Sequence, residues 1–89
     1  MDTDDQLFTQ LISIFYSSAM IALGKLKNPV TDQIERNLVQ AKQSIDILEL
    51  IKEKTKNNLT DSQKRTLDRL LTDLRLNYID ESNKDLISS

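Results

Sequence analysis

The sequence contains no cysteine and no histidine, and these two absences exclude several kinds of chemistry at once. Without cysteine there is no disulfide, no thiol nucleophile and no thiolate metal site. Without histidine, the most frequent general base of enzymes and the other common zinc ligand are also missing. We therefore expect a protein that is not an enzyme and that has no metal site and no cofactor.

Glycine, proline and aromatic residues are scarce. The 89 residues include one glycine, one proline, two phenylalanines and two tyrosines. Tight turns and strand corners need more glycine and proline than this, whereas a core of Leu and Ile suits packed helices. Because 89 residues are enough for one core and too few for two, we predict a single all-α domain spanning residues 1–80.

Charge of one sign is not in large excess. Twelve basic and fourteen acidic residues leave a net charge of −2, which gives no general attraction to nucleic-acid phosphates. The basic cluster at 52–56 contains Glu53 and no aromatic residue for base stacking, so we interpret it as a solvated helix end. Asp2, Asp4 and Asp5 stand where a signal peptide would carry basic residues. We expect a cytoplasmic protein with no nucleic-acid partner.

Hydrophobic periodicity predicts three helices, over about residues 4–24, 32–56 and 60–79. The first is long and apolar, and the other two form a helical hairpin. Residues 81–89 are polar and end in two serines, which predicts a frayed tail. The predicted fold is all-α with three helices that assemble into a dimeric helical bundle.

Residues that favour helix ends support these boundaries. Gly24, the only glycine, is expected to adopt the left-handed conformation that closes a helix. Asp32 with Glu35 forms a capping-box pattern, which predicts the start of the second helix. Thr60 with Gln63 forms the same pattern at the start of the third.

The first helix has more apolar surface than two other helices can cover. No charged residue occurs from Gln6 to Gly24, and the apolar positions occupy most of the helix circumference. A second polypeptide would bury what remains, and a symmetric homodimer is the simplest closed arrangement. The residues predicted to mediate self-association are Leu7, Leu11, Ile14, Phe15 and Ile21.

A membrane role for the same helix is the main alternative. The uncharged stretch Gln6–Gly24 approaches the length that crosses a bilayer. It contains six glutamine, threonine and serine residues before Ala19 and has no basic or aromatic flank at its start, which argues against insertion. We expect a non-catalytic interaction or structural module, with a peripheral membrane protein as the runner-up and an enzyme third.

Four charged residues lie beside the apolar seams of the second and third helices. They are Asp46, Lys54, Asp73 and Arg75, and the arginine could bridge carboxylates in bidentate fashion. One interpretation is an ion-pair network that sets the register of the helices, and the other is a ligand site. We favour the network.

Several short stretches recur in a known family. They are Ala22-Leu23-Gly24, Asn28-Pro29, Ala41 through Ile45-Asp46, Glu53-Lys54-Thr55-Lys56, Asn58-Leu59-Thr60, Leu74-Arg75 and Tyr78. In this order, over roughly residues 7–78, they resemble the small bacterial family called domain of unknown function 1844. The resemblance implies a helical fold and a bacterial cytoplasmic protein, and it implies no activity.

The sequence departs from that family at two helix boundaries. The resemblance implies glycine at positions 32 and 57, where this chain has Asp32 and Asn57. Asparagine is among the non-glycine residues best tolerated in the left-handed region. We therefore predict that Asn57 keeps the turn, at some cost in backbone strain.

Overall fold

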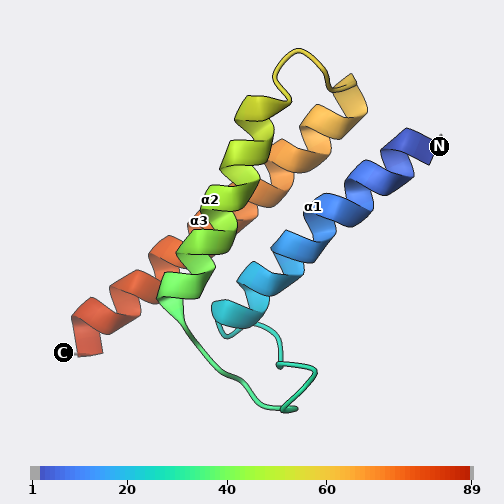
Figure 1. Cartoon of the computed structure of the whole chain (residues 1–89). Helices are drawn as coiled ribbons and strands as arrows, with labels where there is room; N and C mark the ends of the chain where they lie inside the picture. The colour runs from blue at the N-terminus through green and yellow to red at the C-terminus, as the bar shows by residue number, and fades with distance from the viewer. Residues whose placement is uncertain (1–2, 89) are drawn as a thin grey trace.

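The computed structural model describes residues 3–88 and contains three α-helices. They are α1 (Thr3–Ala22), α2 (Leu38–Lys54) and α3 (Asp61–Ser88). In Figure 1, α1 and α2 run antiparallel to each other, and α3 lies behind them and returns antiparallel to α2. The last turns of α3 project past the start of α2. The predicted all-α, three-helix fold with a helical hairpin is confirmed.

The core lies along the centre of the three helices. Two large aliphatic side chains, Ile12 and Leu48, are fully buried there, and three alanines allow α1 and α2 to approach closely. The buried hydrophobic residues follow the three-and-four spacing of helix packing. They are Ile12, Ala19, Ala22, Leu23, Ala41, Ile45, Leu48, Leu67, Leu71 and Leu74.

Two of the predicted helix ends are confirmed. Gly24 has φ +80°, the left-handed conformation expected after a helix. At the start of α3, the Thr60 backbone N–H donates to Gln63 Oε1 at 2.9 Å, and the Gln63 N–H donates to Thr60 Oγ1 at 3.1 Å. These two bonds are the reciprocal pair of a capping box.

The predicted start of the second helix is wrong. Helix α2 begins at Leu38 instead of Asp32, with Asn37 as its N-cap accepting from the Gln40 N–H at 3.1 Å. The Asn28 N–H donates to the Gln33 carbonyl at 2.8 Å, and Asp32 has φ +58°. This closed turn cannot be extended into a helix, so Asp32 and Glu35 do not act as a capping box.

The predicted end of the third helix is also wrong. Helix α3 continues to Ser88, so the residues from 81 to 88 are helical instead of frayed, and Ser89 lies outside the described residues. No glycine or proline follows Pro29 to stop a helix, and Glu81 is buried against other parts of the chain. Ile79, in the preceding turn, is 55% exposed.

Candidate functional site

The residues predicted to mediate self-association are divided between the surface and the core. Leu7, Leu11 and Ile14 remain 57%, 44% and 64% exposed. Ile21 is half-buried on the same side of α1, whereas Phe15 packs against the core. We call Leu7, Leu11, Ile14 and Ile21 the α1 face. It is an apolar surface that residues 3–88 leave largely exposed.

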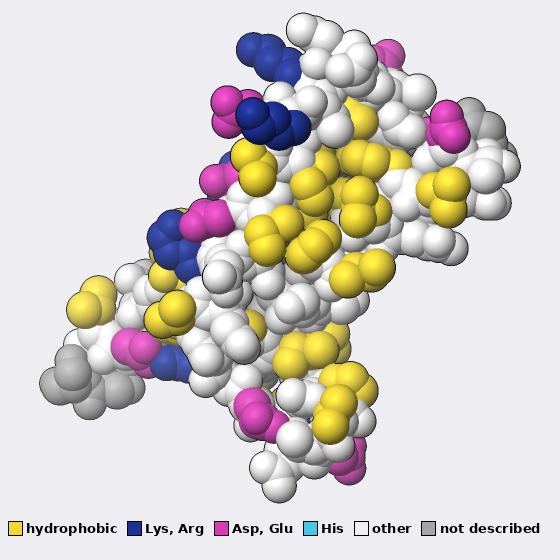
Figure 2. Space-filling view, in the orientation of Figure 1, with side chains coloured by type: hydrophobic (Ala, Val, Ile, Leu, Met, Phe, Trp, Pro, Cys, Tyr) yellow, Lys and Arg dark blue, Asp and Glu magenta, His cyan; other side chains and the backbone are white. Residues whose placement is uncertain are grey.

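The apolar surface continues from α1 onto α2. Ser44 of α2 contacts Ser18 of α1, with 3.3 Å between the hydroxyl oxygens, and the half-buried Ile47 lies one turn further along the same side of α2. Leu50 is 53% exposed. Figure 2 shows hydrophobic side chains gathered over the adjoining parts of these two helices, with few charged groups among them.

A groove of about 920 Å³ adjoins the α1 face. Its apolar lining comes from Ile14, Ile21 and Ala22, and its other wall is the loop that precedes α2. The charged residues at this wall are already engaged, since Thr31 donates to Glu35 and Arg36 pairs with α3. The polar lining residues are Gln10, Ser13, Ser17, Ser18, Asn28, Glu35, Arg36, Asn37 and Gln40. Chemically, the groove offers an apolar floor with a hydrogen-bonding rim.

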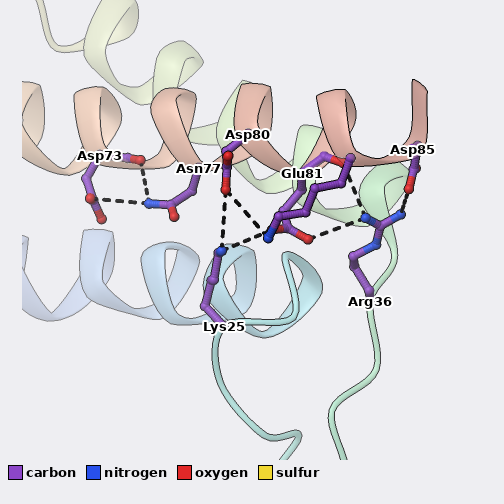
Figure 3. A network of polar contacts seen from close by, with 8 residues as sticks. Lys25, Arg36, Asp73, Asn77, Asp80, Glu81 and Asp85 are labelled. Carbon is purple, nitrogen blue, oxygen red and sulfur yellow. Dashed lines mark hydrogen bonds and ion pairs between the residues drawn. The ribbon is translucent and has the colours of Figure 1, made fainter. Parts of the chain in front are cut away.

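A cluster of ion pairs holds the far wall of this groove in place (Figure 3). Glu81 of α3 accepts from Lys25 Nζ at 3.0 Å, Lys84 Nζ at 2.6 Å and Arg36 Nη1 at 3.4 Å. Arg36 also binds the Asp85 carboxylate. We call these five residues the Glu81 clasp. Because Lys25 follows α1 and Arg36 precedes α2, the clasp ties both ends of the connecting loop to α3.

The clasp is partly shielded from water, and this affects its ionisation. The Glu81 side chain is 8% exposed. Hydrogen bonds from Lys84, Lys25 and Arg36 outweigh the effect of burial and lower the pKa of Glu81 from 4.5 to about 2. The Asp85 carboxylate raises the pKa of Arg36, and Glu81 raises that of Lys84. Glu81, Arg36 and Lys84 therefore stay charged at neutral pH.

Sequence reasoning missed the Glu81 clasp. Its members fall in a loop and in a segment predicted to be a frayed tail. One local signal was available, because Glu81 with Lys84 and Asp80 with Lys84 have the spacings that bring side chains together on a helix. The pairing with Lys25 and Arg36 has no local signal at all.

The structure does not bring the four predicted network residues together. Arg75 binds Glu49 of α2, with Nε and Nη2 at 3.0 and 2.8 Å from Oε1. Asp46 lies on the outer side of α2 and pairs with Lys42 at 3.1 Å. Within residues 3–88, Lys54 makes no ion pair with the other three.

Asp73 instead links α3 to α1. It accepts a hydrogen bond from the Tyr16 hydroxyl at 2.6 Å, and Asn77 Nδ2 donates to Asp73 Oδ1 at 3.3 Å. The hydrogen bond to the Asp73 carboxylate is the main reason that the pKa of Tyr16 is raised. This arrangement supports a polar contact between two helices. It does not indicate a ligand-binding site.

The described part of the chain contains neither a membrane-spanning helix nor a cluster of metal ligands. None of its helices combines the length and the apolar character needed to span a bilayer. Among the same residues, no three acidic side chains converge on a point where a metal ion could bind.

A match to a protein-family model assigns the chain to a family. No curated protein and no solved structure matches it. A family match extends over residues 5–80, which include the apolar surface of α1 and all of α2. The chain therefore belongs to the family described as domain of unknown function 1844 (DUF1844).

Proposed function

We propose that this chain is a non-catalytic interaction module that acts by self-association, as a homodimer formed through the α1 face. The observation that carries the proposal is the exposure of Leu7, Leu11 and Ile14, at 57%, 44% and 64%, in a helix that has no charge between Gln6 and Ala22. Contiguous exposed apolar surface of this kind marks protein interaction sites.

The strength of such a dimer can be estimated from the exposed side chains. Full burial of one aliphatic side chain gains about 1.5–3 kcal/mol, and about half of that remains available for each of these three residues. Six side chains in two copies would then contribute about 5–9 kcal/mol, against an association cost of about 4–15 kcal/mol. Because gain and cost are of the same order, we expect a dimer that dissociates on dilution.

The proposal includes a location. The resemblance to a bacterial family supports a bacterial cytoplasmic protein. The groove beside the α1 face supports binding rather than catalysis, because its charged residues Glu35 and Arg36 are both engaged in contacts within the chain.

An Ile14→Glu substitution tests the proposal. A charge placed at the centre of an apolar interface has no partner and is costly to bury, so the variant should remain a folded monomer at concentrations where the unmodified chain is a dimer. Light scattering at several protein concentrations gives the mass, and circular dichroism checks the helices.

Leu76→Glu is the matched control. Leu76 lies on α3 and is 64% exposed, the same fraction as Ile14. The Leu76→Glu variant should have the same mass in solution as the unmodified chain. A monomer at every concentration for the unmodified chain, or equal dissociation by both variants, would contradict the proposal.

A further inference from the structure

Helix α1 has two seams with the spacing of packed helices. The inner seam faces the core and consists of Phe8, Ile12, Phe15, Ala19 and Ala22. The outer seam is displaced from it by one residue and consists of Leu7, Leu11, Ile14, Ser18 and Ile21. Both follow alternating steps of four and three, the pattern by which two helices interdigitate side chains. The inner seam is filled by α2 and α3, whereas the outer seam meets α2 at Ser18 and leaves Leu7, Leu11 and Ile14 exposed.

We propose that the outer seam packs antiparallel against the outer seam of a second copy of this chain, with Ile14 on the two-fold axis. This inference rests on the proposed self-association and adds its geometry. Ile14 is the midpoint, because Leu7 and Ile21 each lie seven residues from it. A two-fold axis through Ile14 places Leu7 of one copy beside Ile21 of the other, and Leu11 beside the small Ser18.

The charges at the ends of α1 favour the antiparallel orientation. Asp4 and Asp5 lie in the first turn, and the exposed Lys27 follows the last turn, whereas Lys25 is engaged in the Glu81 clasp. An antiparallel pair places the acidic end of each copy near the basic end of the other, and it also opposes the helix dipoles. A parallel pair would place the four aspartates of two copies together. Between these ends, the outer seam carries no charge that could repel a second copy.

The size of the face is sufficient for a specific dimer. Twenty residues of α1 extend about 30 Å, and the adjoining side of α2 widens the face to about 20 Å. Each copy can therefore cover about 600 Å², and the total of about 1,200 Å² reaches the lower end of the range of stable interfaces. The groove beside Ile21 gives Leu7 of the second copy an apolar place to pack.

Single cysteines test this geometry, because the chain has no cysteine of its own. Ile14→Cys should form a disulfide between copies, since the two-fold axis brings its two thiols together. Proteins carrying Leu7→Cys and Ile21→Cys should cross-link when mixed, and each should cross-link poorly alone. The expected rates exceed that of Leu76→Cys, an equally exposed position on α3, by about tenfold or more.

The outcomes separate this inference from the proposed function. Self-linking of Leu7→Cys as fast as that of Ile14→Cys would show a parallel pair and overturn the antiparallel arrangement. If light scattering shows a dimer but no α1 cysteine variant cross-links faster than Leu76→Cys, the outer seam is not the interface. The proposed self-association would still stand. A monomer at every concentration would overturn both. Thermal melting of the reduced variants checks that each one folds.

Discussion

At the residue scale, the loops depend on three positions with positive φ. Gly24 has φ +80°, Asp32 has φ +58° and Asn57 has φ +70°. Glycine adopts this conformation without strain, whereas a side chain raises its energy. The left-handed conformation predicted for Asn57 is confirmed. At Asp32 it belongs to a turn, and not to the helix start that the sequence pattern indicated.

Substitutions at Asn57 test the cost of this conformation. We expect Asn57→Ala to lower the free energy of unfolding by about 1 kcal/mol, and Asn57→Gly to keep it or raise it by up to about 1 kcal/mol. Urea unfolding measures both. Asn58→Ala is the neighbouring control, because Asn58 is exposed and does not have positive φ. Equal losses for the two alanine variants would mean that φ is not the cause.

The lowered pKa of Glu81 predicts a pH dependence of stability. In the unfolded chain Glu81 titrates near 4.5, and in the folded chain it titrates near 2. Its contribution is therefore complete above about pH 5 and is lost as the pH falls toward 2. At pH 7, Glu81→Gln should lower the free energy of unfolding by about 1–3 kcal/mol, and this difference should shrink across the acid range.

A matched variant isolates this effect from the other carboxylates. Glu53→Gln makes the same charge change at an exposed residue that has no ion pair within the described range. Its unfolding free energy should run parallel to that of the unmodified chain from neutral pH to about pH 2. A difference between Glu81→Gln and the unmodified chain that stays constant with pH would contradict the role of the clasp.

At the element scale, the connection between α1 and α2 is long for a compact domain. Residues 23–37 form no helix, and their ends are close because the Asn37 N–H donates to the Ala22 carbonyl at 2.7 Å. Compact loops with close ends are often functional. Here the Glu81 clasp attaches the loop to α3, so the last turns of α3 determine where one wall of the groove lies.

Removing the arginine of the clasp should loosen this loop. We expect Arg36→Met to accelerate amide hydrogen exchange in residues 25–36, because its contacts with Glu81 and Asp85 are lost. Arg75→Met is the control, since it removes an exposed pair with Glu49. It should change the free energy of unfolding by less than about 1 kcal/mol and leave the loop unaffected. Equal exchange in the two variants would contradict the clasp.

At the scale of the whole molecule, three helices leave one side of α1 without a partner. A chain of this size buries a limited share of its surface, so a second copy is an effective way to cover apolar residues. The seam of the proposed interface is uncharged and charges occur only beyond its ends, whereas the clasp depends on ion pairs. The effect of salt concentration therefore distinguishes the proposed interface from the clasp.

The dissociation constant of the proposed dimer should be insensitive to salt. Salt screens charges and has little effect on apolar contacts, so we expect a change of less than about threefold between low and high ionic strength. Sedimentation equilibrium measures this constant. Glu81→Gln provides the comparison, because its stability deficit should decrease as salt screens the ion pairs of the unmodified chain. A dimer that dissociates steeply in salt would point to a charged interface elsewhere on the molecule.

The errors at helix boundaries have a common physical cause. Thr60 and Gln63 form the capping box that their spacing predicts, because nothing competes with it. Asp32 and Glu35 have the same spacing, but the Asp32 N–H donates to the Asn28 carbonyl at 2.7 Å, within the turn closed between Asn28 and Gln33. A polar segment such as 81–88 resembles a tail unless the residues that bind Glu81 are known.

Helical periodicity and residue type are local properties, so they were enough to predict three helices and an excess of apolar surface on α1. Which charges meet depends on the tertiary structure. Glu81 is 56 residues from Lys25 and 45 from Arg36, and no local pattern specifies a contact across such a distance. The tertiary structure also settles that the inner seam of α1 is covered and that most of the outer seam is exposed, because the cover depends on where α2 and α3 lie.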